Sequence, residues 1–87
     1  MKLTKIFTND ECPKCPRAKE LGGLLTKQGF AVQLHDIGTA NGLAEAAFHG
    51  VFTTPSILVV NESEDVIQDW RGVLPTESDV IRALRSA

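Results

Sequence analysis

The two cysteines of this 87-residue chain are Cys12 and Cys15, separated by only two residues between a strand-like and a helix-like segment. Small domains that depend on disulfides for stability normally carry four, six or eight cysteines. A single Cys-x-x-Cys pair provides too few disulfides to stabilise such a chain. The chain therefore has to fold around a hydrophobic core, and the pair is available for redox chemistry or for half of a metal site.

Length and composition indicate a single domain over residues 1–87. Hydrophobic residues make up 43% of the sequence and charged residues 23%, close to the usage of ordinary soluble domains. A chain of this length rarely holds two cores. No stretch approaches the ~20 apolar residues of a membrane-spanning helix, and the N-terminal segment is strand-like instead of resembling a signal peptide. We therefore expect a cytoplasmic protein that does not associate with membranes.

The charge distribution gives no sign of a nucleic-acid partner. The net charge is −2, the basic residues are scattered along the chain, and the sequence has one Trp and no Tyr. It thus offers neither a basic stripe for phosphates nor an aromatic platform for bases. We expect no binding to nucleic acid, and a monomer.

The hydrophobic pattern alternates between strands and helices. Residues 2–7 predict a strand, because Leu3, Ile6 and Phe7 are apolar and no Pro or Gly interrupts them. The other predicted elements are a helix over 13–28, a strand over 30–37, a helix over 43–49, strands over 56–60 and 65–70, and a final helix after Thr76. This order predicts an α/β fold, β-α-β-α-β-β-α, with a four-stranded mixed sheet flanked by helices on both faces.

Local signals predict how several helices begin and end. Gly29 is placed to end the first long helix in the left-handed conformation. The pair Gly22-Gly23 inside that helix predicts a close backbone approach, because glycine is costly there. Thr76 and Asp79 have the spacing of a capping box.

Cys12 is the predicted nucleophile of the dithiol. It precedes the helix, where unpaired N–H groups and the helix dipole favour the thiolate, and Pro13 suits a first helical turn. This setting typically lowers a thiol pKa from about 8.5 into the range ~3.5–7.5. The cation of Lys14 also favours a lower pKa for Cys12, whereas the acids at positions 10 and 11 favour a higher one. We therefore expect the pKa of Cys12 to be moderately lowered.

Cys15 is the predicted resolving thiol. It follows one turn later, where it can attack a mixed disulfide at Cys12 and release the reduced substrate. A zinc site is the alternative use of the pair, and it needs two more ligands. The sequence offers only His35 and His49, which are isolated from each other. A redox dithiol is therefore favoured, with a zinc or iron–sulfur carrier as an alternative.

A second feature is Thr53-Thr54-Pro55, directly before the strand predicted at 56–60. Pro55 cannot donate a hydrogen bond within a central strand, so it belongs at the strand's first position or just before it. The Thr54–Pro55 bond is either cis or an ordinary trans turn bond, and spacing alone does not decide between them.

Together, Cys-Pro-Lys-Cys at a helix start and Thr-Thr-Pro before a hairpin resemble the glutaredoxin branch of the thioredoxin superfamily. The resemblance covers the whole chain and implies the thioredoxin fold. It also implies that Pro55 is cis and faces the dithiol, and that the backbone of Thr54 pairs with an extended substrate. Pro13 and Lys14 are then expected to contact the substrate as well.

The segment from Trp70 to Pro75 resembles that of the NrdH redoxins, the electron donors of ribonucleotide reductase. It implies that Trp70 and Gly72 bind the substrate, although Trp70 also fits the role of a core aromatic. Val73 stands where that family has an aromatic residue, and Pro13 is glutaredoxin-like. The resemblance implies recharging by thioredoxin reductase or a ferredoxin-linked reductase, with no cofactor and no metal.

Glutathione is a less suitable partner for this sequence. Asn9 stands where many glutaredoxins place a cation, and Asp10 and Glu11 would repel an anionic ligand. The predicted function is thus a thiol–disulfide oxidoreductase that reduces protein disulfides, with ribonucleotide reductase as the expected target. A glutathione-dependent glutaredoxin is the other alternative.

Overall fold

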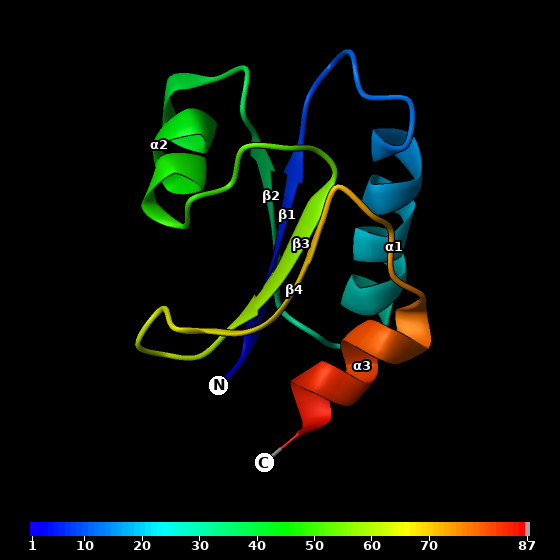
Figure 1. Ribbon diagram of the computed structural model, residues 1–87. Helices are drawn as coiled ribbons and strands as arrows, with labels where there is room; N and C mark the ends of the chain where they lie inside the picture. The colour runs from blue at the N-terminus through cyan, green and yellow to red at the C-terminus, as the bar shows by residue number, and fades with distance from the viewer. Residues whose placement is uncertain (87) are drawn as a thin grey trace.

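The computed structural model describes residues 1–86 and confirms the predicted β-α-β-α-β-β-α order (Figure 1). The elements are β1 (Leu3–Thr8), α1 (Cys15–Lys27), β2 (Val32–Asp36), α2 (Ala40–Phe48), β3 (Ser56–Val60), β4 (Val66–Arg71) and α3 (Glu77–Arg85). The four strands form one mixed sheet. Helices α1 and α3 cover one face of this sheet and α2 covers the other, as expected.

The sheet has the strand order β2-β1-β3-β4. β1 is parallel to β2 and antiparallel to β3, and β3 forms a hairpin with β4. Because β3 runs opposite to β1, the last residues of β1 lie beside the first residues of β3, and Phe7 pairs with Ser56. The loop after β1, which carries the cysteines, and the loop before β3, which ends at Pro55, therefore meet at the same end of the sheet.

Alternation along the strands separates the core into two layers. Ile6, Ile57 and Val59 pack against α1 and α3, whereas Phe7, Leu58 and Val60 face α2. All five residues of β3 are buried, because this strand has neighbours on both sides and helices on both faces. This buried central strand supports the loop before β3 and the neighbouring cysteine loop after β1, which meet at the same end of the sheet.

Helix α1 begins two residues later than the sequence pattern indicated. Pro13 and Lys14 form a turn in which the Cys15 N–H donates to the Cys12 carbonyl at 3.2 Å, so Cys15 is the first helical residue. Pro13 is compatible with such a turn as well as with a first helical turn, which is why the sequence did not separate the two. The end of α1 was predicted correctly, since Gly29 has a φ of +89° there.

Helix α2 begins at Ala40, three residues before the predicted start at 43. The Thr39 side chain caps it by accepting the Gly42 N–H at 3.0 Å. Gly42 also packs so closely that a Cβ there would lie 1.8 Å from the Asp36 carbonyl oxygen. For α3, the predicted capping box is confirmed: Thr76 and Asp79 exchange backbone and side-chain hydrogen bonds.

Only one member of the glycine pair in α1 makes the predicted close approach. A Cβ at Gly22 would lie 3.0 Å from the Ile6 side chain on β1. A Cβ at Gly23 would meet nothing within 4 Å, so for Gly23 the prediction was wrong. The two residues point in different directions on the helix, and only Gly22 faces the sheet.

The two ends of the described chain meet at the end of the sheet opposite the cysteine loop (Figure 1). The Lys2 ammonium lies 3.2 Å from the Ser86 hydroxyl and also contacts the Ser86 carbonyl. Within residues 1–86, no helix is both long enough and apolar enough to cross a membrane.

Candidate active site

Cys12 and Cys15 are joined by a disulfide at the start of α1, with their Cα atoms 5.3 Å apart. Cys15 is buried, with 2% of its surface exposed, whereas Cys12 is partly exposed in the preceding loop. The Cys12 N–H donates to the Asn9 carbonyl at 3.2 Å, and this hydrogen bond closes a turn over residues 9–12, in the loop before α1. The two cysteines thus differ in exposure, and Cys12 is the more accessible residue of the pair.

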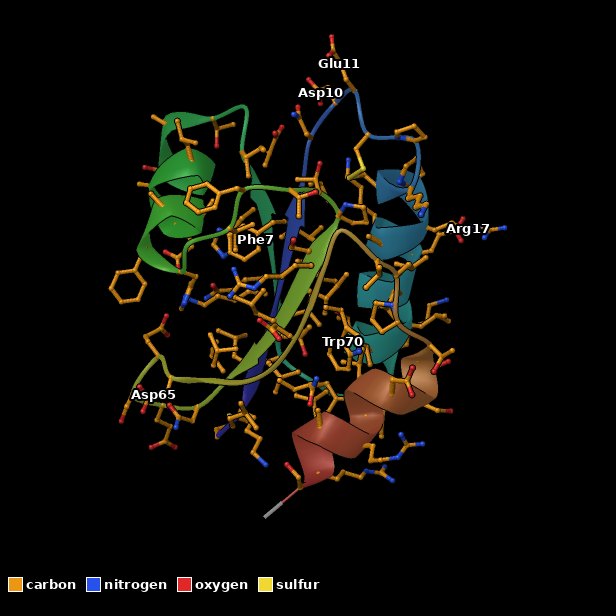
Figure 2. All side chains as sticks on the ribbon, in the orientation of Figure 1. Phe7, Asp10, Glu11, Arg17, Asp65 and Trp70 are labelled. Atoms are coloured by element: carbon orange, nitrogen blue, oxygen red, sulfur yellow. A yellow bond between two sulfur atoms is a disulfide. The ribbon has the colours of Figure 1, made fainter. Side chains whose placement is uncertain are left out.

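The surroundings of Cys12 favour its thiolate form. The first N–H groups of α1 have no partner within the helix and point toward the preceding loop. The first turn of α1 contains no acidic residue, and Lys14 and Arg17 are both exposed beside it. Asp10 and Glu11 project from the tip of the loop, away from the helix (Figure 2).

The Thr54–Pro55 peptide bond is cis, as the family resemblance implied. Pro55 is fully buried and directly precedes β3, at the end of the sheet where β1 leads into the cysteine loop. The Ser56 hydroxyl donates to the Thr53 carbonyl at 2.7 Å and fixes the turn. Thr54, between Thr53 and the buried Pro55, is itself partly exposed. Part of its surface is therefore available for contact with another polypeptide chain.

Gly72 joins the same site from the end of β4. Its N–H donates to the Pro55 carbonyl at 2.9 Å. Its φ is +74°, and a Cβ at this position would lie 3.2 Å from the Thr53 hydroxyl. A residue with a side chain would therefore meet both backbone strain and a steric contact. The structure thus brings Gly72 against the turn that contains the cis proline.

Trp70 is not brought to the disulfide. It pairs with Ile57 across the β3–β4 hairpin and packs, half-buried, against the core layer of α1 and α3. Figure 2 shows Trp70 well below the yellow disulfide bond at the start of α1. Pro13 and Lys14, by contrast, lie exposed between the two cysteines. The substrate-binding role of Trp70 stays a prediction, and its observed contacts are those of a core aromatic.

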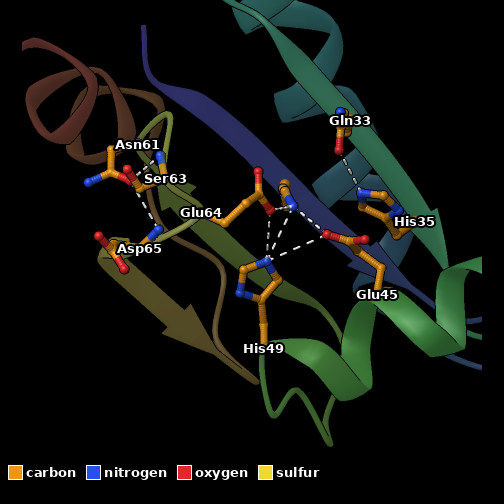
Figure 3. Close-up of polar contacts among 9 residues, drawn as sticks. Gln33, His35, Glu45, His49, Asn61, Ser63, Glu64 and Asp65 are labelled. Atoms are coloured by element: carbon orange, nitrogen blue, oxygen red, sulfur yellow. Dashed lines mark hydrogen bonds and ion pairs between the residues drawn. The ribbon is translucent and has the colours of Figure 1, made fainter.

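A second polar cluster was not anticipated from the sequence. The side chain of Lys5, on β1, is 3% exposed and forms ion pairs with Glu45 of α2 and Glu64 of the β3–β4 turn. Its ammonium also lies 3.2 Å from the His49 ring (Figure 3). Burial by itself lowers the pKa of Lys5, but the hydrogen bonds and charges of the two glutamates outweigh it, and the net pKa is raised.

The same cluster bears on the zinc alternative. Within residues 1–86, the side chains close enough to share a metal ion are Glu45, His49 and Glu64. This group includes neither cysteine, and the Lys5 ammonium already lies among its ligand atoms. His35 stacks on Phe7 with ring centroids 5.2 Å apart, on the α2 face of the sheet. The ligand set that the zinc alternative required is therefore not gathered in one place.

Comparison with known proteins assigns the family. A protein of Archaeoglobus fulgidus described as a probable thioredoxin is 32% identical over 63 residues, which cover 71% of this chain and 68% of the relative. The chain belongs to the thioredoxin family. It is a thioredoxin-like thiol–disulfide oxidoreductase with a close cysteine pair. No family model matches the sequence.

Solved structures of thioredoxins share the fold at low sequence identity. Thioredoxin 1 from Thermosipho africanus superposes with a TM-score of 0.67 at 19% identity, covering 94% of this chain and 89% of that one. An exposed lipoprotein thioredoxin from Streptococcus pneumoniae gives a TM-score of 0.80 at 11% identity, covering 97% and 83%. These likenesses show the thioredoxin fold. The narrower glutaredoxin-type or NrdH-type assignment remains a prediction.

Proposed function

We propose that this thioredoxin-family protein is a reductant of protein disulfides in which Cys12 is the nucleophile and Cys15 the resolving thiol. The observation that carries the proposal is the unequal exposure of two cysteine residues whose sulfurs form a disulfide. Cys12 is partly exposed before the helix, whereas Cys15 is buried as the first residue of α1. A substrate therefore reaches Cys12 first, and Cys15 is within bonding distance of the intermediate.

The proposed reaction is two successive thiol–disulfide exchanges. The Cys12 thiolate attacks one sulfur of the substrate disulfide, forms a mixed disulfide, and the other substrate sulfur leaves as a thiolate. The Cys15 thiolate then attacks the Cys12 sulfur, the second substrate sulfur leaves, and the Cys12–Cys15 disulfide forms. Two electrons pass to the substrate, whose thiolates take up two protons from solvent. The described structure corresponds to the oxidised product of this cycle.

The substrate chain is proposed to bind over the turn that contains Pro55. Thr54 is partly exposed directly before Pro55, and Gly72 supports that turn through its hydrogen bond to Pro55. Pro13 and Lys14 form the exposed rim between the cysteines. Trp70 is proposed to support β4 through its packing in the core layer, and its predicted contact with the substrate is a separate role that the packing does not test.

Deprotonation of Cys15 is assigned to solvent in this proposal. β1 carries no carboxylate, and Lys5, the charged residue of that strand, points to the α2 face instead of the α1 face. The proton of Cys15 therefore passes to water before Cys15 attacks. This predicts that resolution slows at low pH, as the thiol of Cys15 becomes harder to ionise.

We also propose a cytoplasmic location, with ribonucleotide reductase as the target.

The proposed electron source is a flavin-dependent thioredoxin reductase or a ferredoxin-linked counterpart. Support for this electron source comes from the loop before the disulfide, where Asn9 offers no cation and Asp10 and Glu11 are exposed acids. Each exposed charge contributes only about 0.2–1 kcal/mol. The two acids act in the same direction, which disfavours an anionic tripeptide such as glutathione.

A coupled turnover assay tests this proposal. Reduction of a protein disulfide is followed with NADPH and thioredoxin reductase in one reaction, and with glutathione and its reductase in the other. We expect clearly faster turnover with the flavoenzyme. Equal or faster turnover with glutathione would assign the protein to the glutathione-dependent glutaredoxins instead. Absence of turnover with pre-reduced protein would contradict the disulfide-reductase function itself.

A further inference from the structure

The C-terminal end of α2 receives a cation from another strand. Carbonyl groups at the end of a helix have no partner within it, and a positive charge there is favourable. The last turn of α2 contains no basic residue. Arg71, the last residue of β4, supplies the charge: its Nη1 donates to the carbonyls of His49 and Gly50 at 3.2 and 2.9 Å. These two carbonyls directly follow the last helical residue, Phe48.

The guanidinium of Arg71 is itself held in place. Its Nε donates to the Asp69 carboxylate at 2.7 Å. The two residues are two positions apart on β4, so their side chains lie on the same face of the strand. Only 33% of the Arg71 side chain is exposed. Hydrogen bonds from a charged donor are stronger than those between neutral groups, so these contacts fix the end of α2 against β4.

Arg71 and the next residue, Gly72, hold both ends of one segment. Residues 50–55 join α2 to β3 and include the cis bond before Pro55. Arg71 binds the first carbonyl of this segment, at Gly50, and the Gly72 N–H binds the last, at Pro55. The backbone of Arg71 also pairs with Ser56, the residue after Pro55. Two adjacent residues of β4 therefore set where the turn lies relative to α2.

We infer that Arg71 is a positioning residue, which holds the turn containing Pro55 in the form that receives the substrate chain. The inference rests on the proposed disulfide-reductase function, in which the substrate binds over that turn. The polar contacts of the Arg71 side chain lie on β4 and at the end of α2. Loss of the side chain should thus weaken the binding of a polypeptide disulfide and leave the reactivity of Cys12 unchanged.

The kinetic test compares Arg71→Met with the wild-type protein on two disulfides of different size. Methionine keeps an unbranched side chain and removes the donors. Pre-reduced protein is mixed with insulin, whose disulfides lie in polypeptide chains, or with dipyridyl disulfide, which is too small to extend over the turn. The second-order rate constant with insulin should fall at least about fivefold, while that with the small disulfide stays unchanged. Arg71→Lys should recover most of the insulin rate, because an ammonium can still donate to both carbonyls.

Amide hydrogen exchange gives a readout that does not depend on turnover. In Arg71→Met, the Gly72 N–H that binds Pro55 should exchange at least about threefold faster relative to the N–H of Leu58, at the centre of β3. A global loss of stability would speed both amides to the same extent. The ratio of the two exchange rates therefore separates loss of position from loss of stability.

Arg82→Met is the matched control. Arg82 also pairs with an aspartate, Asp79 at 3.4 Å, but its side chain is 77% exposed on α3. Its replacement should leave both rate constants and the exchange ratio unchanged.

Three results would overturn the inference for Arg71→Met: no slowing with insulin, equal slowing with both disulfides, or equal acceleration of the two amides. An Arg71→Lys variant no faster with insulin than Arg71→Met would overturn it as well. If the wild-type protein reduces neither disulfide, the proposed function fails, and the substrate role of Arg71 fails with it. The exchange ratio then still decides whether Arg71 fixes the turn.

Discussion

The backbone N–H of Gly72 donates to the carbonyl oxygen of Pro55 at 2.9 Å, and this bond ties the end of β4 to the turn beside the disulfide. The contact depends on the unusual backbone of Gly72, whose φ is +74°. It also depends on the missing Cβ, since Thr53 occupies the adjacent space. The shape of the turn that contains Pro55 is thus set by a residue 60 positions from Cys12 in the sequence.

Replacing Gly72 with alanine should destabilise the protein and slow disulfide reduction. A left-handed backbone costs a residue with a side chain roughly 1–2 kcal/mol, and the Cβ would lie 3.2 Å from the Thr53 hydroxyl. Urea unfolding measures the stability, and single-turnover reduction measures the activity. Gly23→Ala is the control, because it adds a methyl group in open space within α1 and should stabilise by about 0.5–1 kcal/mol. Unchanged stability of Gly72→Ala would contradict the prediction.

Replacing Cys15 with serine should trap a covalent intermediate. Without the resolving thiol, the mixed disulfide between Cys12 and the substrate cannot be attacked from within the protein, so it should accumulate. Cys12→Ser should form no such species. Mass spectrometry under non-reducing conditions detects the adduct. Alkylation of the reduced wild-type protein should modify Cys12 first, and preferential labelling of Cys15 would reverse the assignment of roles.

Replacing Lys5 with methionine should destabilise the fold through the charges that it leaves behind. Glu45 and Glu64 would face each other without the ammonium that now pairs with both. Removing one partner of a fully buried ion pair costs 3–5 kcal/mol, and we expect about 2 kcal/mol here because both carboxylates reach solvent. The triple variant Lys5→Met, Glu45→Gln, Glu64→Gln should recover most of the loss. If it stays as unstable as Lys5→Met, packing of the lysine stem matters more than charge.

The Lys5–Glu45 pair should also limit stability at both ends of the pH scale. The hydrogen bond from Lys5 holds the pKa of Glu45 below its ordinary value of 4.5, so its contribution is present above that value and is lost as the pH falls through the lowered pKa. The pKa of Lys5 is raised above 10.5, so its contribution is lost as the pH rises past that raised value. Stability measured against pH should be flatter at the acid end for Glu45→Gln than for the wild type. Parallel acid limbs would contradict this.

The elements of the fold could be predicted wherever the signal was local. The capping residues Thr76 and Asp79 and the terminating Gly29 act within one helical turn, and each was identified from spacing alone. The start of α2 could not be found in this way. Asn41 and Gly42 are weak helix formers, and they are helical because Gly42 packs against the Asp36 backbone, a contact made by the folded chain.

The same distinction between local sequence signals and contacts made only in the folded chain applies to the candidate site. Cys12 and Cys15 were identified from their own spacing, whereas the cis bond before Pro55 was expected only through the family resemblance. The Lys5 cluster was missed, because its partners Glu45, His49 and Glu64 lie 40, 44 and 59 residues away along the chain. A lysine in an apolar strand was the one visible signal. It shows that a charge is buried, but not which residues neutralise it.

The contact between Lys2 and Ser86 has a practical consequence for handling the protein. Both ends of the described chain emerge together, at the end of the sheet opposite the disulfide. A tag, a surface tether or a neighbouring domain attached at either end therefore leaves the approach to Cys12 clear. The same proximity allows the ends to be joined by a short peptide and the chain reopened in the exposed β3–β4 turn, which gives a circular permutant with its dithiol untouched.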